Sequence, residues 1–124
     1  MPTQRLADGT PVVEFDPRVE ISPFTLFRQL SANQAPLLID AREGRVALTL
    51  RGAEILPAGS WTPPADRDVV LFDDDGSVAV PRARALQASG HPRVRALFGG
   101  LELYAFALDP EVVGAETFLV AAQS

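Results

Sequence analysis

The 124-residue sequence contains no cysteine and no lysine, and each absence removes a group of chemistries. Without a thiol there is no cysteine nucleophile or persulfide, no thiolate-bound zinc or iron–sulfur cluster, and no disulfide. Without lysine there is no Schiff base, no lysine general base and no lysine of a phosphate-binding loop. All 11 basic residues are arginine. Any activity of the chain therefore depends on other side chains.

Charge and hydropathy exclude further classes of protein. The formal net charge of −5 argues against a nucleic-acid-binding surface and against binding to an anionic membrane. No apolar run reaches the length of a membrane span, and residues 1–10 lack the pattern of a signal peptide. The length and the 47% of hydrophobic residues suit one domain with a single core. We expect a cytoplasmic protein that binds neither nucleic acid nor membrane.

Short apolar runs alternate with helix signals along the chain. Ser22 and Pro23 form a helix start, because a hydroxyl N-cap precedes the residue best suited to the first helical position. The predicted elements are an edge strand at 11–15, a helix from Pro23 that stops before Pro36, strands at 37–40, 53–56, 69–72 and 94–98, helices at 81–89 and 101–108, and a last helix within 111–122. This alternation predicts an α/β fold with a mainly parallel central sheet flanked by helices.

Four short motifs follow one another between Ile21 and Tyr104. They are Ile21-Ser22-Pro23, Asp40-Ala41-Arg42-Glu43, Gly52-Ala53 with Leu56-Pro57, and Val94-Arg95-Ala96-Leu97-Phe98-Gly99-Gly100. In order and spacing they resemble the rhodanese-like (sulfurtransferase) domain family, with Tyr104 where a Trp is usual. The resemblance implies a single rhodanese-like α/β/α domain over residues 21–108. Residues 1–20 are then a lead-in, and residues 109–124 a tail that packs on the same domain.

The active loop is where the chain departs from this family. In the family, a Cys-x-x-x-x-Arg loop follows the central strand; its amides and Arg hold an anion, and its Cys carries sulfur. The loop here is Asp73-Asp74-Asp75-Gly76-Ser77-Val78, with Asp73 at the position of the Cys and Val78 at that of the Arg. A carboxylate cannot carry a persulfide, and three acids repel thiosulfate or phosphate. We therefore expect a catalytically inactive binding or regulatory module with an unidentified protein partner and no cofactor.

The same loop yields a structural prediction. The resemblance implies that loop amides and the positive end of a helix point at one position beyond Phe72. We expect a carboxylate, that of Asp73 or Asp75, to turn back onto the amides of residues 76–78 and fill that position itself. The competing outcome is that Pro81 disfavours helical geometry at Val80, delays the helix and leaves the acids in water.

A divalent-cation site is the alternative interpretation of the acids. Ligands of a parallel sheet gather beyond the carboxyl ends of its strands. Asp40 and Asp73 end two predicted strands, and the resemblance implies that these strands are neighbours. Together with Asp75 they offer oxygen ligands for Mg²⁺ or Ca²⁺, and an enzyme or sensor would follow. The stretch 69–77 also resembles the first motif of haloacid-dehalogenase-like phosphatases. In the opposing interpretation Asp40 bonds local amides or Arg42, and the other acids form a solvated turn.

Three remaining features carry weaker predictions. His91, the only histidine, lies between a predicted helix and strand at the amino ends of the strands, so it forms no catalytic pair with Asp73. Trp61 lies in a Pro-flanked loop and either caps the edge of the core or contacts a partner. The chain is expected to be a monomer or a homodimer, and a third functional alternative is a structural role through self-association. Its candidate surface is the apolar tail with Val112, Val113, Phe118, Leu119 and Val120.

Overall fold

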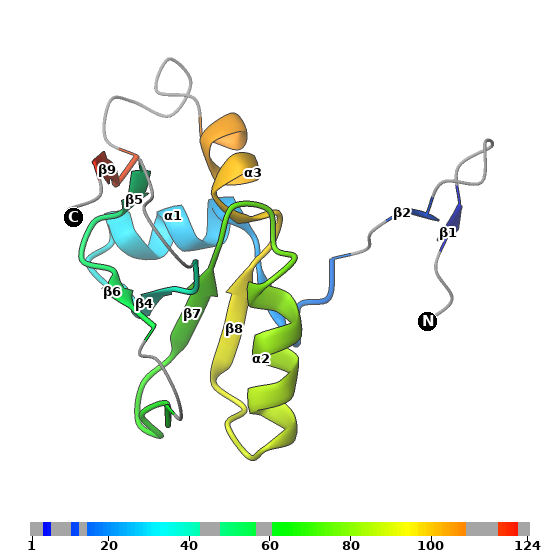
Figure 1. The fold of residues 1–124 in the computed structure, drawn as a ribbon. Coiled ribbons are helices and arrows are strands. Elements are labelled where there is room, and N and C mark those ends of the chain that lie inside the picture. The colour runs from blue at the N-terminus through cyan, green and yellow to red at the C-terminus, as the bar shows by residue number, and fades with distance from the viewer. Residues whose placement is uncertain are drawn as a thin grey trace.

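The computed structural model describes residues 4–5, 11–12, 15–42, 48–56, 61–108 and 117–121 (Figure 1). Two strands at the start, β1 and β2, pair with each other in antiparallel fashion and lie apart from the other elements in Figure 1. The elements in chain order are β1 (Gln4–Arg5), β2 (Pro11–Val12), β3 (Glu20–Ile21), α1 (Pro23–Ser31), β4 (Leu37–Asp40), β5 (Leu48–Leu50), β6 (Glu54–Ile55), β7 (Val69–Phe72), α2 (Ala79–Ala88), β8 (Val94–Leu97), α3 (Gly100–Ala107) and β9 (Leu119–Ala121).

A five-stranded parallel sheet forms the centre of the molecule, in the order β3-β8-β7-β4-β6. All four residues of β7 are buried. Helices cover both faces of the sheet, and its central strand is accordingly an uninterrupted apolar run. The predicted α/β class with a mainly parallel sheet is thus confirmed. Asp40 pairs in register with Phe72, so the acids that end β4 and follow β7 lie at the same edge of the sheet.

Helices cover both faces of this sheet, which gives three layers (Figure 1). Alternate residues of the strands point to opposite faces, and two separate clusters of buried residues result. The cluster on the side of α1 and α3 contains Ile21, Leu26, Leu38, Leu50, Val70, Phe72, Leu97, Leu101, Tyr104 and Leu108. The cluster on the side of α2 contains Val19, Ile39, Val69, Leu71, Ala79, Ala83, Val94 and Ala96, with Trp61 partly buried against it. Trp61 therefore caps the edge of the core.

Helix α1 begins where the sequence predicts. The hydroxyl of Ser22 accepts a hydrogen bond from the Thr25 N–H at 3.2 Å, and Pro23 occupies the first helical position. The N-cap satisfies one of the amides that a helix start leaves without an intrahelical partner. The helix ends at Ser31, well before Pro36.

Helix α2 begins at Ala79, two residues earlier than predicted, and Val80 is helical. The prediction that Pro81 delays this helix is wrong. Pro81 lies in the first turn, where a backbone N–H has no intrahelical acceptor, so the missing donor costs no hydrogen bond. The amides of Val78 and Ala79 consequently lie at the helix start, directly after the Asp loop.

The tail forms a strand where a helix was predicted. Leu119–Ala121 is β9, which pairs in antiparallel fashion with β5; residues 111–116 and 122 lie outside the described residues, and Val112 and Val113 with them. The Phe118 ring packs against Phe27 with centroids 6.0 Å apart, and the Thr117 carbonyl accepts a 2.5 Å hydrogen bond from the Tyr104 hydroxyl. The described part of the tail thus packs on the same domain. No helix of the described segments is long and apolar enough to cross a membrane.

Candidate functional site

The loop of residues 73–78 joins the central strand β7 to helix α2 at the carboxyl edge of the sheet. In a parallel α/β sheet this edge is where ligands bind. Asp40, at the end of the neighbouring strand β4, lies beside it. The sheet therefore brings two of the three carboxylates that the sequence singled out to one edge.

The Asp73 carboxylate is turned into its own loop. Its Oδ1 accepts a hydrogen bond from the Gly76 N–H at 2.6 Å, and its Oδ2 accepts from the N–H groups of Val78 at 2.6 Å and Ala79 at 3.2 Å. Asp73 is only 2% exposed. The prediction that an aspartate fills the amide cluster is confirmed for Asp73. An anionic acceptor at a helix start satisfies orphan donors and the positive end of the helix together.

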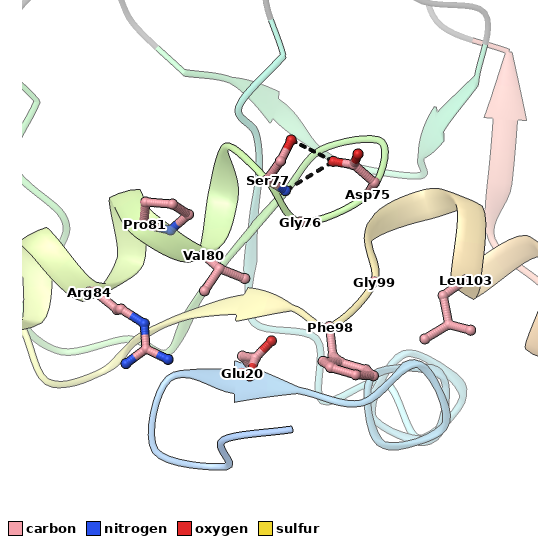
Figure 2. Close-up of a pocket in the computed structure, with 10 residues that line it drawn as sticks. All are labelled: Glu20, Asp75, Gly76, Ser77, Val80, Pro81, Arg84, Phe98, Gly99 and Leu103. Carbon is pink, nitrogen blue, oxygen red and sulfur yellow. Dashed lines mark hydrogen bonds between the residues drawn. The ribbon is translucent and has the colours of Figure 1, made fainter. Parts of the chain in front are cut away.

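The Asp75 carboxylate serves the outer side of the loop. Its Oδ1 accepts from the Ser77 N–H at 2.9 Å and from the Ser77 hydroxyl at 2.6 Å, contacts that Figure 2 shows as dashed lines. The Ser77 hydroxyl first, and its backbone N–H second, lower the pKa of Asp75 below the ordinary value. Asp75 therefore stabilises a turn and leaves the amide cluster to Asp73.

Arg42 binds the other two acids of this edge. Its Nε and Nη2 donate to the two carboxylate oxygens of Asp40 at 2.9 and 2.7 Å, and its Nη1 donates to Asp74 at 3.0 Å. Burial acts to raise the pKa of Asp40, but the hydrogen bonds and charge of Arg42 outweigh it and leave that pKa lowered. The hydrogen bond to Asp40 in turn raises the pKa of Arg42. A largely buried guanidinium thus ties the end of β4 to the Asp loop.

The Gly99-Gly100 motif fixes the loop from the other side. The N–H of Leu101 donates to the Asp73 carbonyl at 2.8 Å. Gly99 and Gly100 both have positive φ, at 71° and 64°. A Cβ on Gly100 would lie 2.4 Å from the carbonyl carbon of Asp74, so only glycine allows this approach. The sequence motif is thus explained by backbone packing of α3 onto the loop.

The three carboxylates proposed for a cation have other partners in the structure. Asp40 is bound by Arg42, Asp73 by loop amides and Asp75 by Ser77. Among the residues that the structure describes, no group of three or more His, Cys, Asp or Glu side chains is arranged to hold a metal ion. Binding of Mg²⁺ or Ca²⁺ at Asp40, Asp73 and Asp75 stays a prediction.

A pocket of about 590 Å³, which no local sequence signal predicted, lies beside the loop (Figure 2). It is walled by strands and helices that are distant in the chain, so only the folded sheet brings them together. The lining residues are Glu20, Asp75, Gly76, Ser77, Val80, Pro81, Arg84, Phe98, Gly99 and Leu103. His91 lies at the opposite edge of the sheet, between α2 and β8, where its backbone N–H donates to the Leu86 carbonyl.

The chain has a rhodanese-like α/β fold and contains no cysteine. Solved structures with the same fold support this class. A rhodanese-related protein from Thermoplasma volcanium aligns with a TM-score of 0.56 at 14% identity, over 73% of this chain and 93% of that chain. A protein from Bacillus halodurans aligns with a TM-score of 0.59 at 15% identity, over 73% of each chain. A protein from Lactobacillus plantarum aligns with a TM-score of 0.58 at 17% identity, over 73% and 83%.

Comparisons of sequence find no such likeness. No family model matches the chain, and no curated protein matches it significantly. The rhodanese-like fold is therefore established by structure, and the identities of 14–17% carry over no activity.

Proposed function

We propose that the protein is a non-catalytic rhodanese-like domain that acts as a protein-binding or regulatory module. The observation that carries this proposal is the Asp73 carboxylate, which holds the three amides of the loop itself. In an active loop these donors would face the transferred sulfur or an incoming anion. Here they are already satisfied by a group that has no nucleophilic sulfur to offer.

The rim of the loop supports the same conclusion. Val78 stands where the family places its Arg, and it is 46% exposed, so an apolar surface replaces a cation. Asp74 adds a 67% exposed carboxylate, whose charge is paired with Arg42. An anionic substrate would meet repulsion rather than a cradle. What this edge of the sheet offers instead is the apolar pocket beside the loop, a feature that suits recognition of a partner.

Sulfur transfer is tested directly with thiosulfate or mercaptopyruvate as donor and cyanide as acceptor. We expect no thiocyanate above a heat-treated sample, since the chain contains no cysteine. The variant Asp73→Cys alone should also stay inactive, because Val78 supplies no cation and the new thiol is followed by Asp74 and Asp75. Clear activity of that single variant would show that the loop remains catalytic in shape and would contradict the proposal.

The binding role is tested by comparing two variants on helix α3. Leu103→Gln alters the pocket, whereas Phe106→Gln alters an 84% exposed side chain that does not line it. Proteins cross-linked to the purified domain in an extract of its own cells are identified by mass spectrometry. We expect specific partners with the wild type and with Phe106→Gln, and their loss with Leu103→Gln. Identical captures by all three proteins would contradict recognition through this pocket.

A further inference from the structure

Glu20 is an acid buried at the base of the pocket beside the loop. It lies on β3, the edge strand of the sheet, and is only 4% exposed. It pairs in register with Ala96, a member of the cluster on the α2 side, so its side chain lies on that face. Figure 2 shows its carboxylate pointing into the pocket, toward the space between Arg84 and Phe98.

This carboxylate is only half satisfied. Its Oε1 accepts a hydrogen bond from the Asp16 N–H at 2.8 Å, and the described residues offer no hydrogen bond to its Oε2. Arg84, the one basic residue of the pocket lining, pairs instead with Asp16 at 3.7 Å. Within the described part of the chain, no ion pair joins Arg84 to Glu20. Since no buried side-chain oxygen of the described residues lacks a hydrogen-bond partner, Oε2 is accessible from the pocket. A ligand that donates to Oε2 adds a charge-assisted hydrogen bond there.

The rest of the pocket indicates what kind of donor fits. Val80, Phe98 and Leu103 give it apolar walls, and Asp75 adds a second negative charge at the loop. A cation on an apolar stem matches this arrangement, since the stem is buried while the head reaches a carboxylate. The net charge of −5 also favours the approach of a basic segment.

We propose that this pocket receives a lysine or arginine side chain of a partner polypeptide, with its charged head on Oε2 of Glu20 and its stem against Phe98 and Leu103. The inference rests on the proposed function, because it names the chemistry of a partner that binds at the same edge of the sheet. The pocket volume of about 590 Å³ exceeds that of one such side chain and leaves room for an apolar neighbour in the same segment.

The test is a titration followed by amide chemical shifts of the isotopically labelled full chain. The probes are acetylated, amidated tripeptides with Lys, Arg or Gln between two leucines, and n-butylammonium as a free amine. We expect saturable shifts at Ser77, Val80 and Leu103 with the Lys and Arg peptides and none of comparable affinity with the Gln peptide. Equal binding of the Gln peptide, or no binding of any peptide, overturns the proposal. Butylammonium binding as tightly as the Lys peptide also overturns it and assigns the pocket to free amines.

Matched variants locate the interaction. Glu20→Gln keeps an acceptor for the Asp16 N–H but removes the charge, and should weaken the Lys peptide by about tenfold. Asp68→Asn removes the same charge from the exposed residue before β7, at the opposite edge of the sheet, and should change affinity by less than about twofold. If Glu20→Gln fails to fold, Arg84→Gln serves instead and should strengthen binding by about twofold. Wild-type affinity in both pocket variants refutes the inference.

Failure here is distinguishable from failure of the proposed function. The assay of sulfur transfer reports only on the loop and on the position that the Asp73 carboxylate fills there. Capture of partners that depends on Leu103 but not on Glu20 would support recognition through the pocket without a basic side chain.

Discussion

The most informative perturbation of the loop is Asp73→Ala. It removes the acceptor of the Gly76, Val78 and Ala79 amides, at distances of 2.6, 2.6 and 3.2 Å, from a position that is 2% exposed. The neighbouring acids have other partners, because Asp74 is bound by Arg42 and Asp75 by Ser77. The variant therefore leaves an amide cluster at the start of α2 without its partner.

Two reference values bound the expected loss of stability. Replacing a helix N-cap by Ala costs about 0.5–2 kcal/mol. A hydrogen bond to a charged group contributes about 1.5–3 kcal/mol, so three of them give an upper bound that water at the exposed side of the loop reduces. Since Asp73 satisfies more donors than an ordinary cap and is buried, we expect its loss to cost about 2–3 kcal/mol.

Urea unfolding followed by the fluorescence of Trp61 measures this loss, because that residue packs against the core. With an m value near 2 kcal/mol/M, the midpoint should fall by about 1–1.5 M. Asp74→Ala is the matched control. Its carboxylate is 67% exposed and forms one ion pair, so the loss should stay below about 1 kcal/mol. If Asp73→Ala is as stable as the wild type or more so, relief of charge repulsion outweighs capping. The claim that Asp73 stabilises the loop is then wrong.

Three further results follow from the same geometry. Asp40→Asn should cost about 1–3 kcal/mol at pH 7, since Arg42 loses the more buried of its two charged partners and keeps only Asp74. Because folding lowers the pKa of Asp40, this difference is present above the unfolded-state pKa of about 3.9 and shrinks as the pH falls through the folded-state pKa. Unfolding curves between pH 7 and 3 measure this change. Gly100→Ala should destabilise far more than Gly52→Ala, which has a positive φ of 82° but open space around it and should cost about 1–2 kcal/mol in urea melts; equal losses would refute the close packing of loop and α3. Millimolar Mg²⁺ or Ca²⁺ should leave the melting temperature unchanged, whereas a rise that Asp73→Asn abolishes would establish the cation site.

The elements that the sequence predicted well have local signals. Helix α1 has an N-cap and a proline at its first position, and β4 and β7 have uninterrupted apolar runs of four residues. Strands β3, β5 and β9 have two or three residues each, and their pairing partners are distant in the chain. Such short strands exist only through tertiary contacts, so periodicity does not reveal them.

The two errors have physical reasons. Pro81 excludes helix only where a backbone donor is needed, and the first turn of α2 needs none at that position. The apolar residues of the tail suggested a helix, but Phe118 has a positive φ of 68° and Leu119 packs against the core, which leads into a strand. Apolar composition alone does not distinguish a packed strand from a packed helix.

The candidate site was predictable in part. The hydrogen bonds of the Asp73 carboxylate to the loop amides were predictable, because this acid stands where the strand, the loop and the helix start meet. The bridge from Arg42 to Asp74 spans 32 residues in sequence, and the buried Glu20 lies on an edge strand too short to be recognised. Both depend on which strands are neighbours, a property of the sheet order rather than of local sequence.

The central claim, that Asp73 takes the place of an anion, is tested most directly by titrating the labelled protein with thiosulfate. The amide resonances of Gly76, Val78 and Ala79 are followed in the wild type and in a variant that combines Asp73→Ala with Asp74→Asn, Asp75→Asn and Val78→Arg. If the Asp73 carboxylate occupies the amide cluster, these amides show no saturable shifts in the wild type at millimolar thiosulfate. They show new, saturable shifts once the carboxylate is removed. Saturable binding of thiosulfate to these amides in the wild type would contradict it.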